Sequence, residues 1–453
     1  MNPVFVSTVT VTAPQPDRRR DRFRFILFLG FLASQWFQVP VFSLPVNWAL
    51  WPTLPDLFAA GILLSYLLGP GSTKRAPFDR ANARDIALMT AVYAANFLLV
   101  TVPAGCGLDG IRYGLHSVYV MTKSGVLYSL VSRVPLDGTR SRYVHRAAVL
   151  AFAGVSVTAI GTAWDAFDLG FFVAHLPRDS AGPWAGPALS STAGRTHGVT
   201  ATAALLLAAL SLATAPRRVP KARLAILVTT LLVAFFTGSR QGVVRTLTFA
   251  AVDLARNARI GTLWLSLVAL CCVSIFSEPI VSFLYESPAS RAALERHATL
   301  ATDPFSEEGL SGRPELWRRA LARFAGSPKS LILGLGVGTS VEARSVAHNL
   351  FLQLLQDLGI PGALLVVWLW LRIFRRVISA RREAWTSFAL TVGMLTSVFT
   401  STLFYPSLSE GGLLSLYLVV LRTTIGARQQ RPASGSRASS ARGSCFGELP
   451  ERF

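Results

Sequence analysis

The sequence has little charge and very little cysteine, and both shortages exclude classes of protein. Only 15% of its residues are charged while 51% are hydrophobic, and the mean hydropathy is +0.45. An ordinary soluble domain is about 25% charged, so the chain is too apolar to be one. The four cysteines have spacings that fit neither a disulfide framework nor a metal site: Cys106, Cys271, Cys272 and Cys445.

Acidic residues are also scarce, because 24 Asp and Glu stand against 44 Lys and Arg. The apolar residues lie between the basic stretches in blocks long enough to cross a bilayer core of about 30 Å. The sequence therefore predicts an all-α, polytopic membrane protein with about twelve transmembrane helices. The twelve expected spans are residues 24–44, 55–69, 85–103, 115–132, 145–163, 198–214, 222–237, 241–256, 260–276, 360–375, 385–404 and 410–425.

The basic residues are distributed unevenly between the two sides of this topology. With the N-terminus inside, the cytoplasmic segments hold 30 of the 44 Lys and Arg, the outer side holds 12, and Lys123 and Arg245 lie within spans. Eight of the outer 12 lie in one long loop, so the short outer loops carry only four. The positive-inside rule requires such a distribution. The charge thus indicates topology and attraction to anionic lipid, and we expect no nucleic-acid partner.

The polar segments divide the chain into five parts. Residues 1–23 are expected to form a cytoplasmic tail, and the first span, which no small-residue cleavage site follows, a retained anchor. Residues 24–276 are predicted to form a membrane domain of about nine helices, and residues 348–425 are predicted to form a second membrane domain of about three helices. Between them, residues 277–347 predict a helical loop domain on the outer face, because so long a connection is usually functional or disordered. Residues 426–453 are rich in Ser, Arg, Gly and Pro and predict a disordered cytoplasmic tail.

One histidine has a distinctive setting. His348 opens the segment HNLFLQLLQDLGIPG, residues 348–362, which predicts a short amphipathic helix that the following glycines and proline break before the next span. Its apolar face would carry Leu350, Phe351, Leu354, Leu355 and Leu358, and the opposite side Asn349, Gln353 and Gln356. An imidazole placed where membrane meets water can reach a lipid-borne substrate. A lone histidine at a helix start is, however, more often a cap or an interface residue.

Two arginines are candidate anion-binding residues. Arg240, in TGSRQG, lies at an outer turn, where an arginine is costly unless it snorkels, pairs or lines a polar cavity. The alternative is a snorkelling arginine in a tight turn, and Arg245, further along, is expected to be a tolerated polar position. Arg313, in SGRPELW, precedes a proline suited to the first helical position, so it would lie at a helix N-terminus that favours an anion. The alternative is a charge on an exposed helix face.

The remaining motifs carry weaker signals. Arg318, Arg319 and Arg323 are expected on the exposed face of the helix that follows Arg313. The run GLGVG, residues 334–338, is similar to a phosphate-cradling loop, but it follows no strand, so we expect a flexible turn that leads back to the membrane. No second histidine or carboxylate stands at ligand spacing near His348, and no metal or other cofactor is expected.

Together the segments TGSRQG, SGRPELWRRAL, GLGVG and HNLFLQLLQDLGIPG resemble the superfamily of bacterial O-antigen ligases and O-antigen polymerases. The resemblance covers roughly residues 220–375; elsewhere it rests on span count and loop placement. It implies a glycosyltransferase of the bacterial cytoplasmic membrane. Such an enzyme moves a glycan from undecaprenyl diphosphate to a glycan or lipid acceptor on the outer face. Gln241 departs from the common pattern, in which a small residue often follows the first arginine.

The resemblance assigns roles to six residues. The family's conserved arginines fall on Arg240 and Arg313, which would bind the diphosphate, and its histidine falls on His348, which would be catalytic. Ser239, Trp317 and Asn349 belong to the same motifs and would support them. Arginine gives permanently charged, forked donors to phosphate oxygens, and an imidazole has a suitable resting pKa for a general base. His348 could alternatively only orient the acceptor.

Several functions remain open at the level of sequence: a ligase, a polymerase, a related enzyme that glycosylates proteins, and a transporter or flippase. The three candidate site residues argue against a fifth, a non-catalytic scaffold. A ligase transfers the finished chain to a lipid A core or another anchor, whereas a polymerase transfers the growing chain to the next lipid-linked repeat. The HN segment favours the ligase. A transporter or flippase would explain the span count and the intramembrane charges, but it would not predict a structured outer loop flanked by the GSR and HN segments.

Overall fold

The chain is all helical in the part that the structure, a computed structural model, describes. That part comprises residues 18–43, 51–68, 77–164 except 135, 170–175, 197–215, 220–257, 291–298 except 292 and 296, 313–342, 346–381, 384–398 except 397, 404–406 and 411–429. Its main helices are α1 (Arg18–Ala33), α2 (Leu54–Leu67), α3 (Pro77–Asn96), α4 (Leu108–Val131), α5 (Gly138–Ala163), α7 (His197–Thr214), α8 (Pro220–Phe236), α9 (Arg240–Asn257), α13 (Arg313–Phe324), α14 (Pro328–Leu333), α15 (Thr339–Glu342), α16 (Leu350–Ser379), α17 (Trp385–Leu395) and α18 (Gly411–Gln429).

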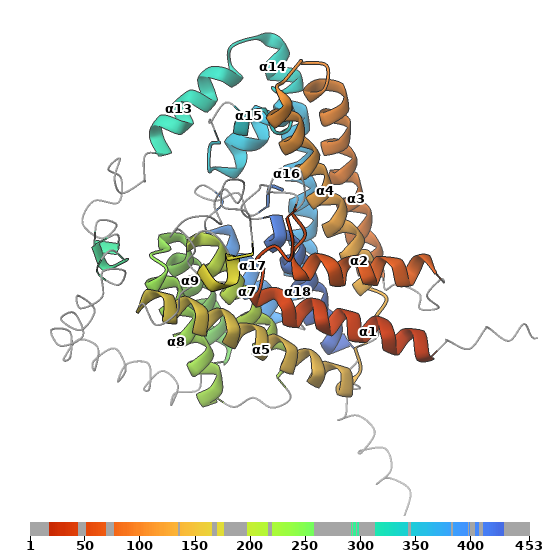
Figure 1. Ribbon diagram of the computed structural model, residues 1–453, viewed down its shortest axis with the longest axis vertical. Helices are drawn as coiled ribbons and strands as arrows, with labels where there is room; N and C mark the ends of the chain where they lie inside the picture. Colours follow the sequence, from red (N-terminus) through yellow and green to blue (C-terminus); the bar gives the residue numbers. More distant parts are fainter. Residues whose placement is uncertain are drawn as a thin grey trace, which may run out of the picture.

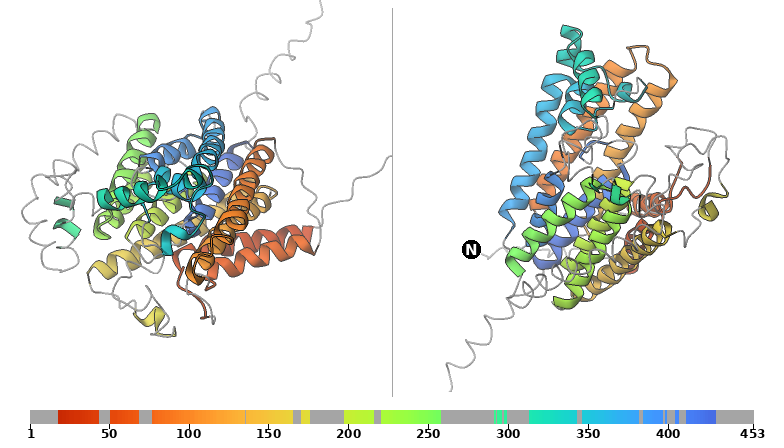
Figure 2. Two further views of the ribbon diagram at one scale, coloured as in Figure 1. Left: turned by 90° about the horizontal axis from the view of Figure 1, so that it is seen from above. Right: turned by 90° about the vertical axis from the view of Figure 1, so that its left-hand side faces the viewer.

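The helices form two groups joined by α18. Helices α3, α4 and α16 run side by side, and α13 and α14 lie across one end of them (Figure 1). The second group contains α5, α7, α8, α9 and α17, as both views in Figure 2 also show. Helix α18 packs on α4 and on α7 and so connects the groups, while α1 and α2 pack on each other along one side.

The predicted spans agree with the helices in position more than in number. Eleven of the twelve overlap helices, and the span at 260–276 lies outside the described residues. Two of the eleven extend well beyond their helices: the span at 24–44 continues past the end of the short helix η1 (Ser34–Trp36), and the span at 385–404 continues past the end of α17 at Leu395. Three helical segments are long and apolar enough to cross a membrane by length and composition: Phe78–Thr101, Gly138–Ala163 and Leu350–Ser379. The structure thus shows an all-helical chain with membrane-spanning character, and the count of twelve spans stays a prediction.

Helices extend into both predicted tails. Helix α1 begins at Arg18, so residues 18–23 of the predicted cytoplasmic tail are helical. Helix α18 continues to Gln429, so the tail predicted from residue 426 begins at least four residues later. Arginines extend α1 beyond its apolar part, and Ala427, Arg428 and Gln429 extend α18; all of these residue types are good helix formers.

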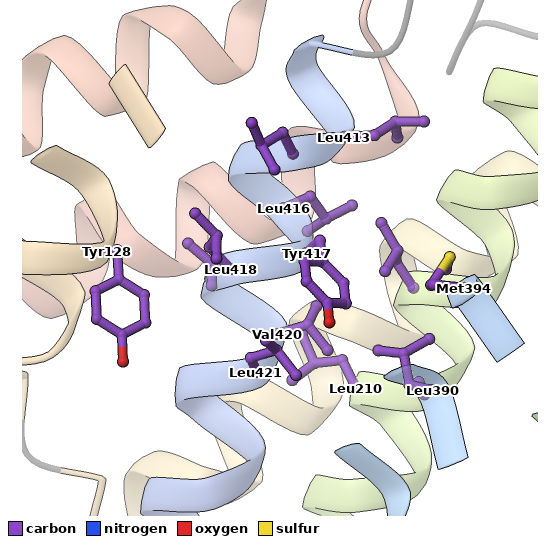
Figure 3. Close-up of a cluster of buried hydrophobic side chains, with 14 of the residues drawn as sticks. Tyr128, Leu210, Leu390, Met394, Leu413, Leu416, Tyr417, Leu418, Val420 and Leu421 are labelled. Carbon is purple, nitrogen blue, oxygen red and sulfur yellow. The ribbon is translucent and has the colours of Figure 1, made fainter. Parts of the chain in front are cut away.

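Helix α18, like α7, is deeply buried. Its residues from Leu413 to Ile425 are all buried, since the neighbouring helices cover every face of it. Figure 3 shows Tyr417 and the leucines of α18 between Tyr128 of α4 and a second set of side chains on the other helix group: Leu210, Leu390 and Met394. The core therefore lies between the two groups.

Buried ion pairs fix α3 to α16 and α18. The carboxylate of Asp79 lies 3.0 Å from Nε of Arg422, and that of Asp85 lies 3.3 Å from Nε of Arg372. Arg376 also pairs with Asp85. Both aspartates are almost completely buried. Since an unpaired buried charge is very costly, these pairs fix how the helices pack.

Candidate functional site

The three residues predicted to carry chemistry all lie at helix N-termini. Arg240 is the first residue of α9, Arg313 is the first residue of α13, and His348 stands two residues before the start of α16. Both arginines are half-buried, and His348 is exposed. The first turn of a helix carries a partial positive charge, so each of these positions is electrostatically favourable for an anion.

A hydrogen bond from Trp317 connects α13 with the segment that carries His348. The indole Nε1 of Trp317 donates to the carbonyl oxygen of Ala347 at 2.8 Å, and α13 packs on α16. Arg313 stands four residues before Trp317, so both lie on the same face of α13. Arg313 and His348 therefore lie at the same corner of the molecule, which the order of the motifs alone could not show.

The backbone on both sides of His348 is held in place. The N–H of Ala347 donates to Oε1 of Gln353 at 3.1 Å, so hydrogen bonds fix Ala347 at both its amide and its carbonyl. The Asn349 side chain accepts from the N–H groups of Phe351 and Leu352 at 3.0 and 3.2 Å and caps α16. His348 itself has φ of +49°, and no other non-glycine residue in the described ranges has positive φ. Such a conformation persists only where the surroundings impose it.

A buried polar cluster lies directly beneath this corner, and sequence reasoning missed it. Nε2 of Gln353 donates to Oδ2 of Asp357 at 2.8 Å and to Oγ of Ser340 at 2.6 Å. The hydroxyl of Tyr405 also donates to Asp357. The signal in the sequence was Asp357 itself, because it is the sole Asp, Glu, Lys or Arg between His348 and Arg372. An ionisable residue within an apolar membrane segment is by default a candidate for a functional role.

The amphipathic helix predicted after His348 differs from the structure on its polar side but not in where it breaks. Gln353 and Gln356, expected on a polar side opposite the leucines, are buried, because the loop before the helix covers that side. The predicted break at the glycines and proline is confirmed, because Gly359 has a non-helical backbone with φ of +71° and ψ of 177°. A second helical segment of α16 follows this kink and runs on to Ser379.

The run GLGVG packs against this kink and is not a loose turn. Pro361 has no N–H to donate to the carbonyl of Asp357, four residues earlier, and Gly336 N–H donates to that oxygen instead, at 3.2 Å. Leu335 N–H similarly donates to the carbonyl of Gln356 at 2.8 Å. The loop therefore satisfies the carbonyls that the kink leaves unpaired.

The other side of the same loop is bound by the end of α3. The Asn96 side chain donates to Leu333 O and accepts from Val337 N–H, both at 2.9 Å. Thr101, at the end of the π-helical turn η3 (Phe97–Thr101), donates to Val337 O at 3.0 Å. The glycines thus permit close approach to the protein's own helices, so we expect no phosphate within this loop.

Arg240 follows a turn that Ser239 stabilises. Oγ of Ser239 accepts from Gly242 N–H at 3.1 Å, and the buried Ser239 therefore caps α9. The predicted turn between two helices is confirmed, since residues 237–239 join α8 to α9. The support that Ser239 gives to Arg240 comes through the backbone.

Helix α17 shows where Arg240 lies relative to α16. It runs antiparallel to α9, because Trp385 near its start donates to Val252 O at 3.0 Å, and Gly393 near its end packs against Arg245 O. Just beyond the end of α17, Val398 O accepts from Leu350 N–H at 3.0 Å. The N-termini of α9 and α16 therefore both lie toward the same end of α17.

The remaining arginines differ in their environments. Arg245, expected to be a tolerated polar position, is completely buried and donates to Thr202 on α7. Arg318 and Arg319 are exposed, as predicted, and pair with Glu315 at 2.7 and 2.9 Å. The prediction is wrong for Arg323, which is half-buried. Arg313 therefore differs from Arg318 and Arg319: it lies at the N-terminus of α13 on the same face as Trp317.

The chain matches no protein-family model and no curated protein sequence. The roles of Arg240, Arg313 and His348 therefore stay predictions, which depend on their motifs and on the geometry of the corner that α13 and α16 form.

Proposed function

We propose that this protein is a glycosyltransferase of the bacterial cytoplasmic membrane that transfers a glycan from undecaprenyl diphosphate to an acceptor on the outer face, as O-antigen ligases do. The observation that carries the proposal is the environment of His348. Its imidazole is exposed, its backbone has positive φ, and the residue before it is hydrogen-bonded to both Trp317 and Gln353. Such an arrangement fixes the position of the His348 backbone, from which the imidazole side chain extends.

The chemistry needs one base and two cations. The acceptor hydroxyl loses its proton to the imidazole of His348 as its oxygen forms a bond to the anomeric carbon of the donor. The bond between that carbon and the phosphate oxygen breaks, and the lipid diphosphate leaves with additional negative charge. Arg313 and Arg240, each at a helix N-terminus, stabilise that charge through their guanidinium donors and the positive end of the helix dipole.

The decisive experiment compares the undecaprenyl-linked glycans of a strain that lacks the protein with those of the parent strain. Long chains retained on the carrier are the expected result, because a ligase acts after chain growth. Single repeats alone would show that chain growth is missing, which would make the protein a polymerase with the same site. An unchanged carrier pool on the outer face would contradict both, and accumulation on the inner face would indicate a flippase.

A further inference from the structure

A groove between α3 and α4 lies apart from the site described above. It has a volume of about 510 Å³, and it is lined by a stripe of residues from each helix. From α3 the stripe has Arg80, Ala83, Arg84, Ala87 and Thr90, and from α4 it has Thr122, Gly125, Val126 and Ser129. Helix α3 lies at the edge of its helix group (Figure 1), so the groove opens at the periphery of the protein.

The middle of the groove is lined by small residues and by threonines whose hydroxyl groups already donate hydrogen bonds within their own helices. Small residues at Ala83, Ala87 and Gly125 produce the hollow. Its two threonines already donate within their own helices, Thr90 to Ile86 O at 2.9 Å and Thr122 to Val118 O at 2.8 Å. Their hydroxyls therefore need no hydrogen bond from a ligand, and a hydrocarbon chain can lie against this wall at no polar cost.

One end of the groove is strongly basic. Arg80 and Arg84 stand four residues apart on one face of α3, and both are exposed. The neighbouring carboxylates form ion pairs with arginines of other helices: Asp79 pairs with Arg422 on α18, and Asp85 pairs with Arg376 on α16. Arg84 lies 4.0 Å from Asp85 at its nearest, with 71% of its side chain exposed. Both guanidiniums can therefore bind a phosphate from outside the protein.

The length of the groove matches a lipid chain. Ten residues separate Arg80 from Thr90, which is about 15 Å along a helix axis. That distance is about half of the 30 Å hydrocarbon core of a bilayer, the depth of one leaflet. A soluble anion would use the arginines and leave the apolar part empty, whereas a phospholipid fills both parts.

We infer that this groove binds one anionic phospholipid, with its headgroup phosphate at Arg80 and Arg84 and an acyl chain between α3 and α4. Basic pockets between transmembrane helices bind such lipids in general. The inference is independent of the glycosyltransferase proposal, because no residue of the groove belongs to the His348 site.

The test measures lipid binding to the full chain in non-ionic detergent by native mass spectrometry, with phosphatidylglycerol and phosphatidylcholine as the two probes. The wild type should bind phosphatidylglycerol roughly tenfold more tightly, since each arginine contributes to anionic lipid binding. The double variant Arg80→Gln/Arg84→Gln should lose that preference. Ala87→Phe, which obstructs the apolar part, should weaken phosphatidylglycerol binding although both arginines remain.

The control is Arg142→Gln/Arg146→Gln, which removes two exposed arginines at the same spacing from α5. It should keep the preference. An equal loss in the control, or no preference in the wild type, would overturn the inference in favour of general surface charge. Displacement of the lipid by an equal concentration of inorganic phosphate, or an Ala87→Phe variant that binds normally, would overturn it in favour of an anion site without a chain.

Discussion

The indole nitrogen of Trp317 lies 2.8 Å from the carbonyl oxygen of Ala347, the residue directly before His348. Through this bond α13, a helix of the predicted long loop, helps to fix the backbone beside the candidate base His348, which directly precedes the cap of α16. Helix α13 begins at Arg313, one turn before Trp317. The same contact therefore also positions Arg313, the candidate diphosphate-binding residue, relative to His348, the candidate base.

Trp317→Phe should therefore lower glycan transfer while the protein stays folded. The substitution keeps an aromatic ring but removes a hydrogen bond of about 1 kcal/mol, so we expect turnover to fall by roughly fivefold to tenfold. Trp385→Phe is the matched control, because Trp385 also donates to a carbonyl, that of Val252 at 3.0 Å, away from His348. Equal activity of the two variants in a transfer assay would contradict a positioning role for Trp317.

His348→Ala and Arg313→Ala should each lower transfer by about 10²-fold or more, because they remove the base and a charge-stabilising donor. His348 is exposed and Arg313 half-buried, so neither substitution creates a large cavity. Arg318→Ala removes an exposed arginine of the same helix that pairs with Glu315, and it should leave transfer unchanged. Near-normal activity of a folded His348→Ala protein would exclude the general-base role.

Gly336→Ala should destabilise the protein strongly, because Gly336 has φ of +100° and its new Cβ would lie 2.6 Å from Oγ1 of Thr101. Gly105→Ala separates the two causes: φ there is +65°, but nothing lies within 4 Å of the new Cβ. Thermal unfolding in detergent should show a free energy of unfolding lower by about 1–3 kcal/mol for Gly336→Ala than for Gly105→Ala, the typical cost of overpacking. Equal losses would mean that the GLGVG loop is not held against η3.

The local features of the site could be predicted from the sequence, and its long-range contacts could not. A proline after Arg313 and a Gly-Ser turn before Arg240 are signals within a few residues, and both helices begin at these arginines. The GLGVG run showed its glycines but not their partners, since Asn96 lies 241 residues from Val337, to which it is bonded. Chain proximity carries no information on such a pairing.

The buried side of α16 illustrates the same limit. Helical spacing placed Gln353 opposite the leucines, and that position alone favours a solvated face. Burial follows from the preceding loop and from Tyr405, 48 residues away from Asp357. Asp357 could have been found as a lone charge in an apolar segment, whereas its partners required the fold.

Tyr405→Phe should test whether this cluster stabilises the site. The substitution removes one donor from Asp357, whose side chain is completely buried and whose Oδ1 has no hydrogen-bond partner in the described ranges. Leaving a buried acceptor less satisfied costs about 1–3 kcal/mol, so the midpoint of thermal unfolding should fall clearly. Transfer should also decrease, because Gln353 bonds both to Asp357 and to Ala347 beside His348.

Tyr66→Phe is the comparison for this last variant, since Tyr66 is only partly buried and donates to a backbone carbonyl, that of Leu130 at 3.2 Å. It should lower the midpoint less and leave transfer unchanged, because its acceptor is a neutral group away from α16. If Tyr405→Phe lowered stability but kept full transfer, the cluster would support the fold without positioning His348. If it changed neither, the hydrogen bond to Asp357 would contribute nothing that a phenyl ring cannot replace.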